Sequence, residues 1–282
     1  MNQIWSENVQ GVLTLYLSRE LRFHDAFQGQ YRELFDLDGE RQLRILEIGC
    51  GPGALAGALH RWYPQAEIVG LDRDSKFIAF AKDHVPGVTF LEGDATALPF
   101  SDGSFDVTIS NTVSEHIDPD LFYSEQRRVL RENGVCLVLS ARKGVKHLAP
   151  CMAETEAERR FWETVEVEDV VQKFGVGRYA MTEQQLPQAM ECRGFHQVSA
   201  GYAVIPLTPD SASLPRQLAE QIIEADRQSA LEILRSTHHP RAAEIEKIVQ
   251  SKFDTRLELL RTGTHQWDTE TAITMVVRGV KK

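Results

Sequence analysis

A short apolar run leads directly into a glycine-rich turn near residue 50, and this feature constrains the fold most strongly. Leu43–Ile48 has the pattern of a buried strand, Gly49–Gly53 forms the turn, and Ala54–Trp62 has helical spacing. Glycine permits positive φ angles and lets the backbone approach a ligand closely. The start of a helix presents free N–H groups at the same place. The sequence therefore predicts a nucleotide-binding turn in a parallel α/β sheet.

The order of strand followed by helix continues to about residue 140. Short apolar strands alternate with helices, a pattern typical of βαβ units and of a parallel sheet with right-handed crossovers. We therefore predict an α/β, Rossmann-like, doubly wound fold. The strands expected after the first are Ile68–Leu71, Val88–Leu91, Phe105–Ser110 and Val135–Leu139, and the helices are Ser75–Asp83 and Pro119–Arg131.

The two ends of the chain add further elements. Residues 8–36 have the spacing of one or two amphipathic helices, and residues 214–262 that of two more, separated at His238-His239-Pro240. Thr182 and Gln185 fit a capping box that opens a helix ending at Cys192. The β-rich segments expected in this part of the chain are Phe195–Ile205 and Ala272–Val280.

These elements predict three parts. Residues 1–40 form an N-terminal helical cap, residues 41–213 and 264–282 form the nucleotide-binding domain, and residues 214–263 form a helical insertion. From its position, we interpret the insertion as a lid or a dimerisation element, the second of which would make the protein a homodimer.

Charge and composition narrow the classes of partner. The formal net charge of −10 argues against a nucleic-acid partner, because phosphate binding needs a basic face. No apolar run approaches the roughly 20 residues of a membrane span, and the N-terminus lacks the pattern of a secretory signal. The four cysteines are scattered, as expected for reduced thiols in a cytoplasmic protein. Two adjacent histidines, His238 and His239, point in different directions on a helix, so no metal site is expected.

An acidic residue follows the second predicted strand. Asp72 lies about 20 residues beyond the glycine turn, where a carboxylate accepts hydrogen bonds from ribose hydroxyls. Gly49, Gly51 and Ala54 also satisfy the dinucleotide fingerprint G-x-G-x-x-A. The turn and Asp72 together are compatible with several nucleotide cofactors, and an acid at a strand end can instead cap a helix.

Later motifs distinguish between these cofactors. They are Glu47-Ile48-Gly49-Cys50-Gly51-Pro52-Gly53, Gly70-Leu71-Asp72, Gly93-Asp94-Ala95, Leu98-Pro99-Phe100, Ser104-Phe105-Asp106-Val107, Ser110-Asn111, Glu115-His116-Ile117 and Arg128-Val129-Leu130-Arg131-Glu132-Asn133-Gly134. With these motifs, the chain over residues 43–140 resembles the class I S-adenosylmethionine (SAM)-dependent methyltransferases, specifically the small-molecule branch related to enzymes of ubiquinone and menaquinone biosynthesis. Asn133 departs from the pattern, since the family usually has proline or glycine there.

The resemblance implies a mostly parallel seven-stranded sheet whose last strand, with Ala272–Val280 as the candidate, runs antiparallel. It also implies that SAM is the cofactor, S-adenosylhomocysteine the product and a small molecule the acceptor. The residues that it assigns to the cofactor are Glu47, Gly49, Cys50, Gly51 and Gly53 at the methionine end, Asp72 at the ribose, Arg73, Asp94 and Ala95 at the adenine, and Asn111 and Thr112 at the methionine moiety.

Three further residues are candidates by position. Tyr16 and Arg19 are three residues apart on the N-terminal helix, so we hypothesise that Arg19 pairs with the SAM carboxylate while Tyr16 closes over it. The alternative is a solvated arginine and a core tyrosine. His116 follows the fourth strand and is the leading candidate for a catalytic base, because histidine titrates near neutrality. The alternative is a structural role for the Glu115-His116 pair.

Three other functions compete with a methyltransferase. A nicotinamide-dependent oxidoreductase would explain the glycine turn and Asp72 but not the Gly93-Asp94-Ala95 motif. A non-catalytic SAM-binding protein would keep the same motifs, because methyl transfer demands no invariant base. A nucleic-acid methyltransferase disagrees with the net charge and with Ser110-Asn111-Thr112-Val113, which is not the Asn/Asp-Pro-Pro-Tyr/Phe motif of the amino-methylating enzymes.

Overall fold

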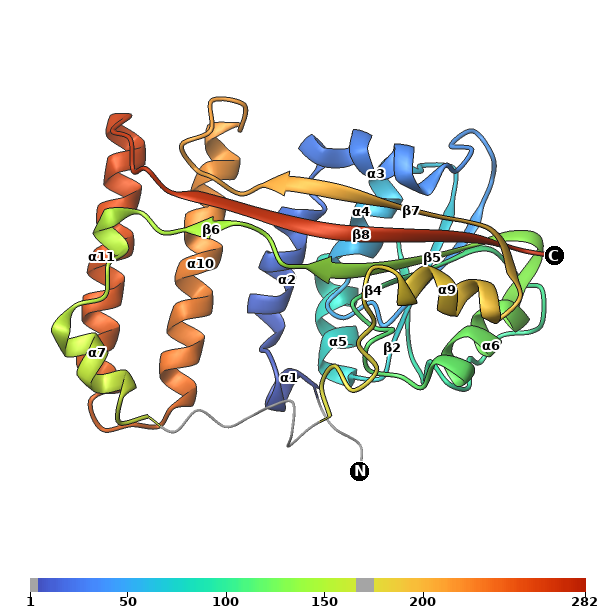
Figure 1. Cartoon of the computed structure of the whole chain (residues 1–282), viewed down its shortest axis with the longest axis horizontal. Coiled ribbons are helices and arrows are strands. Elements are labelled where there is room, and N and C mark those ends of the chain that lie inside the picture. Colours follow the sequence, from blue (N-terminus) through green and yellow to red (C-terminus); the bar gives the residue numbers. More distant parts are fainter. Residues whose placement is uncertain (1–4, 166–174) are drawn as a thin grey trace. The chain divides into compact units, whose positions relative to one another are not determined.

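The computed structural model describes residues 5–165 and 175–282, and the chain divides into two compact units (Figure 1). The first comprises Met1–Arg142, Val170–Val204 and Ile273–Lys282, and the second comprises Lys143–Asp169 and Ile205–Ala272. The second unit is therefore larger than the helical insertion expected at residues 214–263. It also takes in residues 205–213 and 264–272 on either side of that insertion, and the separate segment Lys143–Asp169.

A mostly parallel sheet forms the centre of the first unit. Its strands follow the order β3-β2-β1-β4-β5-β8, with β7 also paired to β8. Neighbouring strands from β1 to β5 pair in parallel, whereas β8 runs antiparallel to β5, as predicted. The bounds are β1 Arg44–Ile48, β2 Glu67–Asp72, β3 Thr89–Glu92, β4 Phe105–Asn111, β5 Leu130–Arg142, β7 Phe195–Pro206 and β8 Thr269–Lys281.

Two details of the strands differ from the expectation. The described residues form eight strands rather than seven, because the two-residue strand β6 (Lys146–His147) pairs with the start of β8 in the second unit. Strand β5 also begins five residues earlier than Val135 and includes Asn133, whose φ is 64°. Asparagine tolerates this left-handed conformation better than most residues, which explains how it stands where the family usually has proline or glycine.

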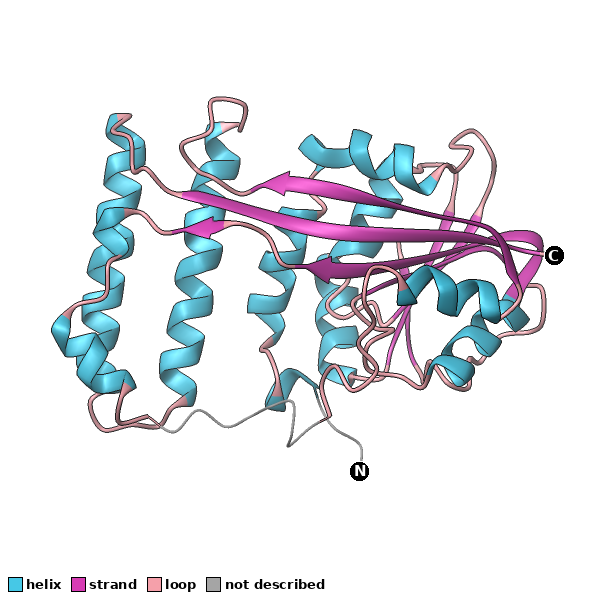
Figure 2. Cartoon of the chain, viewed as in Figure 1, coloured by secondary structure: helices cyan, strands magenta, loops and turns pink. Residues whose placement is uncertain are grey.

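Helices cover both faces of this sheet (Figures 1 and 2). Helices α2, α4 and α5 lie on one side, and α6 and α9 lie on the other. The predicted reciprocal bonds between Thr182 and Gln185 are present at 3.0 and 3.2 Å, at the start of α9. The bounds are α1 Trp5–Asn8, α2 Val12–Arg22, η1 Asp25–Phe27, α3 Gln28–Phe35, α4 Ala54–Trp62, α5 Ser75–His84, α6 Pro119–Val129 and α9 Gln185–Cys192.

The pleat of β1 separates structural from functional side chains. Leu46 and Ile48 are fully buried in a core cluster that includes Phe122 of α6 and Met190 of α9. Because successive side chains of a strand point to opposite faces, Glu47 faces away from that cluster, although it too is buried. Charged side chains are rarely buried unless they have a binding partner, so the buried Glu47 indicates that a ligand binds at this end of β1.

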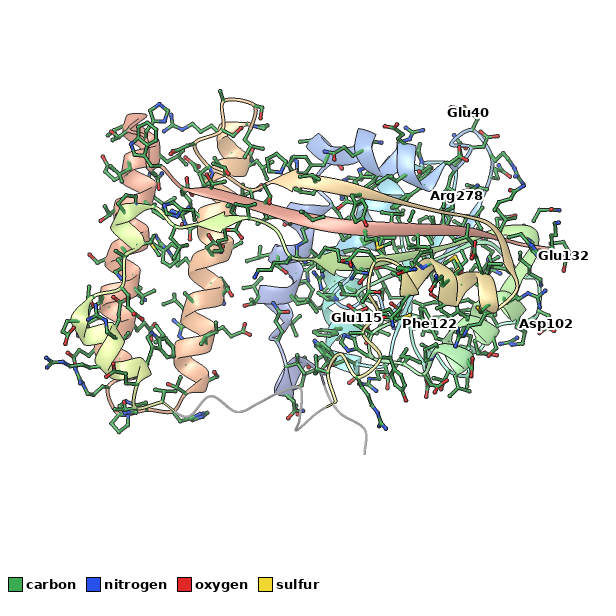
Figure 3. All side chains as sticks on the ribbon, in the orientation of Figure 1. Glu40, Asp102, Glu115, Phe122, Glu132 and Arg278 are labelled. Carbon is green, nitrogen blue, oxygen red and sulfur yellow. The ribbon has the colours of Figure 1, made fainter. Side chains whose placement is uncertain are left out.

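Polar contacts fasten the N-terminal helices to the last strand. Arg278 of β8 donates a hydrogen bond of 3.1 Å to the carbonyl of Phe35, the last residue of α3. Its guanidinium also forms an ion pair with Asp36, and Figure 3 labels its side chain on β8. Residues near both ends of the chain thus contribute to the first unit.

The second unit is built on two long helices, α10 (Arg216–Ser236) and α11 (Ala242–Thr262), as the sequence predicts. They bury an apolar cluster with Phe161 of α7 (Glu156–Trp162), beside the short helix η2 (Pro150–Met152). A polar network accompanies this cluster: the buried guanidinium of Arg256 pairs with the buried Asp268 and with Asp226. The described residues of the whole chain contain no helix long and apolar enough to cross a membrane.

Candidate functional site

A pocket of about 490 Å³ opens in the first unit around the glycine-rich turn. Its wall contains residues at or just after the carboxyl ends of β1, β2, β3 and β4, which in an open α/β sheet is the usual place for a ligand. Of the residues expected at the cofactor, the wall includes Arg19, Glu47, Gly49, Cys50, Gly51, Asp72, Arg73, Asp94, Ala95, Asn111 and Thr112, together with His116.

Backbone hydrogen bonds fix the shape of the turn. The N–H groups of Gly49 and Cys50 both donate to the carbonyl of Leu71, at 2.7 and 3.0 Å. Gly49 has a φ of 67°, and a Cβ atom there would lie 2.4 Å from Val113. The N–H of Gly51 donates to Asp72 Oδ2 at 2.8 Å. The turn therefore requires glycine at position 49, and the backbone of the turn holds the Asp72 carboxylate at the pocket.

Two carboxylates in the wall carry unusual electrostatics. Burial, together with the nearby Asp72, raises the pKa of Glu47 well above its usual value, and Glu47 Oε2 has no hydrogen-bond partner among the described residues. Burial also raises the pKa of Asp72, which the N–H groups of Asp74 and Gly51 oppose. Unpaired buried carboxylates cost free energy, so this part of the pocket is suited to a ligand with cationic and hydroxyl groups.

A guanidinium faces the same pocket from α2. Arg19 Nη2 donates to Thr112 Oγ1 at 2.8 Å, and in the described part of the chain no carboxylate forms an ion pair with it. Burial, with Arg22 as the next cause, lowers the pKa of Arg19 to about 9, so the group stays positively charged at neutral pH. Thr112 presents its hydroxyl from a backbone with φ of 55°, a conformation that is strained for a β-branched residue. The pocket therefore holds a charge suited to a carboxylate.

The remaining predicted cofactor residues lie at or just after the ends of β2, β3 and β4. Asp94 Oδ1 accepts hydrogen bonds from the N–H and the hydroxyl of Thr96, both at 2.8 Å, which leaves Asp94 Oδ2 outside these two bonds. Arg73 is exposed at the rim of the pocket. The structure brings together groups that the sequence separates by almost 100 residues.

His116 is held in one orientation. Its Nδ1 accepts a hydrogen bond of 2.9 Å from the N–H of Gly177, and its ring packs at 4.8 Å from the ring of Trp5. The backbone of the preceding residue, Glu115 (labelled in Figure 3), accepts a bond of 2.8 Å from the N–H of Tyr179. Burial, followed by the nearby Arg73, lowers the pKa of His116 to about 4. At neutral pH His116 is therefore uncharged, and its role as a base stays a prediction.

Two predicted residues lie elsewhere. Among the described residues, Tyr16 and Gly53 are not part of the wall of this pocket. The Tyr16 hydroxyl donates to Glu20 at 3.2 Å and its ring packs on Phe80, because the face of α2 toward the pocket carries Leu15 and Arg19, four residues apart, and Tyr16 is turned about 100° from Leu15. The Cα–H of Gly53 faces Phe90 and Ala81, so this glycine serves close packing.

The wall also contains residues that sequence reasoning missed. Trp5, Phe23 and Phe77 contribute aromatic surface, and Arg178 contributes a guanidinium. Nothing in the local sequence around Arg178 shows that this segment meets the loop after β4.

The fold and the pocket are those of a nucleotide-binding class of α/β domain, and comparison with known proteins shows which proteins this part of the chain resembles. Residues 46–138 match the family model described as "Methyltransferase domain". This match confirms the resemblance to methyltransferases drawn from the motifs of residues 43–140.

Characterised relatives and solved structures agree. The chain is 40% identical over 111 residues to a fatty-acid O-methyltransferase of Mycolicibacterium smegmatis, a match covering 38% of this chain and 39% of the relative. It is 31% identical over 155 residues to a malonyl-[acyl-carrier protein] O-methyltransferase of Herminiimonas arsenicoxydans, covering 55% and 53%. The chain thus spans about half the length or less of these relatives.

The same fold occurs in phosphoethanolamine N-methyltransferase 2 of Haemonchus contortus, solved in complex with S-adenosyl-L-methionine. That structure aligns with 98% of this chain and 59% of its own, at 18% identity and a TM-score of 0.55, so the likeness is one of fold. None of these matches supports the nicotinamide-dependent alternative.

Proposed function

We propose that this protein is a cytoplasmic, SAM-dependent methyltransferase that acts on a small-molecule acceptor. The observation that carries the proposal is that one pocket contains two groups of opposite charge without an ionic partner. They are Glu47, whose Oε2 accepts no hydrogen bond, and the Arg19 guanidinium, which has no carboxylate partner in the described part of the chain. The amino-acid end of SAM carries an ammonium and a carboxylate, and these two groups complement Glu47 and Arg19.

The remaining wall residues fit the rest of the cofactor. Asp72 would accept from the ribose hydroxyls, since each of its oxygens uses one lone pair on a backbone N–H and keeps another. Asp94 and the backbone of Ala95, beside Arg73, would hold the adenine, and Asn111 with Thr112 would contact the methionine moiety.

Catalysis in this proposal relies on positioning. When bound, SAM supplies a methyl group that is already activated on a sulfonium, so the protein needs no difficult chemistry of its own. The residues of the wall orient the two reactants and exclude water, and proximity alone can account for about 7–11 kcal/mol of a barrier.

Several features support the finer parts of the proposal. The names of the two relatives support an acceptor other than nucleic acid, as does the net charge of −10. The four free cysteines support a reducing compartment. For the helical pair α10 and α11, the proposal keeps the role of lid or dimerisation element, which a measurement of molecular mass in solution would test.

Calorimetric titration of the purified protein tests the cofactor. We expect SAM and S-adenosylhomocysteine to bind, NADH not to bind, and Asp72→Ala to weaken both adenosyl ligands. Asp83→Ala, an exposed carboxylate of α5 outside the pocket, is the matched control and should bind normally. Binding of NADH alone would refute the proposal in favour of an oxidoreductase. Binding of SAM without methyl transfer to any acceptor would indicate a non-catalytic binding protein.

A further inference from the structure

The hydrogen bond at His116 determines where the ring carries its proton. An N–H group can donate only to a nitrogen with a free lone pair, so Nδ1, which accepts from Gly177, is unprotonated. The neutral imidazole therefore carries its hydrogen on Nε2. In this arrangement both nitrogens are committed: Nδ1 is an acceptor already in use, and Nε2 is a donor.

This hydrogen bond is one of two that join the described part of the loop around Gly177 to the loop after β4. Gly177 has a φ of 73°, and its loop is joined to the loop after β4 a second time, where the N–H of Tyr179 donates to the carbonyl of Glu115. Trp5 packs against the imidazole ring. The orientation of His116 is thus held by two segments distant in the sequence, Trp5 and the loop that contains Gly177 and Tyr179.

The groups around His116 favour an anion. Arg73 and Arg178 are exposed and line the same pocket as His116. Of the two nearest acids along the chain, Glu115 is not part of the pocket wall and accepts from the Ser114 hydroxyl at 3.3 Å. The other, Asp118, is committed as the N-cap of α6, where it accepts from the N–H groups of Asp120 and Leu121. Cationic side chains disfavour an ammonium acceptor and favour a carboxylate.

The wall on either side of His116 is apolar. Val113 and Ile117 flank it along the loop, both in the pocket wall and both packed against the core of the first unit. Together with Trp5 they offer apolar surface to the part of the acceptor next to its charged group.

We infer that the acceptor is a carboxylate on an apolar carbon skeleton, and that His116 binds one of its oxygens as a hydrogen-bond donor through Nε2 rather than acting as a base. This inference rests on the proposed function. A phenol or an alcohol must lose a proton, and His116, whose Nδ1 already accepts from Gly177 and whose Nε2 carries the hydrogen, is not placed to take it. A carboxylate is already ionised at neutral pH.

The chemistry then balances without a base. One carboxylate oxygen forms the bond to the methyl carbon, the carbon–sulfur bond breaks, and its electron pair stays on sulfur. An anion and a sulfonium become a neutral ester and a neutral thioether, and no proton is transferred.

Matched acceptors test the acceptor class. Dodecanoic acid, dodecanol, dodecylamine and 4-octylphenol are each incubated with the protein and radiolabelled SAM, and the products are identified. We expect the methyl ester from the acid and no product from the other three. Methylation of the amine or the phenol in preference to the acid would overturn the inference. Calorimetry with S-adenosylhomocysteine, run in parallel, separates this failure from failure of the proposed function, in which no adenosyl ligand binds.

Substitutions at His116 test its role. His116→Ala should lower kcat/KM for the acid by about 10- to 100-fold, mainly through KM, as for a lost hydrogen bond to a charged group. His116→Gln has an amide donor and no basic nitrogen, so it should recover part of that loss. If the Gln variant is as impaired as the Ala variant while both bind S-adenosylhomocysteine normally, the donor role is refuted. His196→Ala, an exposed residue of β7, is the matched control.

A readout independent of turnover is the tautomer itself. In ¹⁵N-histidine-labelled protein, the His116 resonances, assigned by comparison with His116→Gln, should show a protonated Nε2 and an unprotonated Nδ1 at pH 7. Adding dodecanoate to the complex with S-adenosylhomocysteine should shift the Nε2 signal most. An Nδ1-protonated ring would contradict the inference.

Discussion

Removing the guanidinium of Arg19 should weaken the binding of SAM through its carboxylate alone. Arg19 reaches the pocket from α2, and its bond of 2.8 Å to Thr112 Oγ1 holds it in place. A hydrogen bond to a charged group contributes about 1.5–3 kcal/mol. Arg19→Ala should therefore raise the Kd for S-adenosylhomocysteine about 10- to 150-fold.

The assay is calorimetry with two ligands. 5′-Methylthioadenosine has the same adenosine and thioether as S-adenosylhomocysteine but lacks the amino-acid carboxylate and ammonium. Arg19→Ala should leave its affinity within about twofold, and Arg41→Ala, an exposed loop residue, should change neither affinity. Equal losses for both ligands would mean that Arg19 only supports the fold of the pocket, and no loss for either would mean that it is a solvated arginine.

Three more substitutions separate function from stability. Glu47→Gln should weaken S-adenosylhomocysteine about tenfold or more, yet raise the melting temperature of the free protein at pH 7. Burial raises the pKa of Glu47, so stability falls as the pH rises from the unfolded pKa of about 4.3 through the folded pKa, and the gain should shrink toward pH 4 in calorimetric melts. Gly49→Ala should abolish adenosyl-ligand binding in the same titrations, since its Cβ would lie 2.4 Å from Val113, and a variant that binds normally would show that the turn can shift. Asp268→Ala should destabilise the second unit by up to about 3–5 kcal/mol in urea unfolding, because it removes the buried partner of Arg256 and leaves only the more exposed Asp226. The double variant Arg256→Met/Asp268→Leu should recover most of that loss, and a double variant worse than the single one would contradict this reasoning.

Local patterns were enough to predict most elements of this fold. The helix Ala54–Trp62 has the predicted bounds, and the break at His238-His239-Pro240 separates α10 from α11 as expected. Apolar periodicity and turn residues act within a few positions of one another, so the sequence displays them directly.

Contacts between distant segments were not predictable in the same way. The hydrogen bond from Gly177 to His116 joins residues 61 apart, and nothing in either local pattern indicates the other partner. The second unit shows the same limit, because Arg256 pairs with Asp226, 30 residues earlier in the chain, as well as with Asp268. The position of Tyr16 outside the wall of this pocket has a different cause: residues three apart differ by about 60° around a helix, which is enough to turn one of them away from a pocket that the other faces.

The contrast between the two units shows how buried charge distinguishes a binding site from a scaffold. In the second unit burial raises the pKa values of Asp226 and Asp268, but both carboxylates form ion pairs with Arg256. In the pocket of the first unit burial likewise raises the pKa values of Glu47 and Asp72 and lowers that of Arg19, but among the described residues neither Glu47 nor Arg19 forms an ion pair. Each shift means that burial favours the uncharged form of the side chain, and an oppositely charged or hydrogen-bonding ligand would favour the charged form again. A single molecule bearing an ammonium, a carboxylate and ribose hydroxyls would relieve all three, and this is why the charges argue for SAM independently of the sequence motifs.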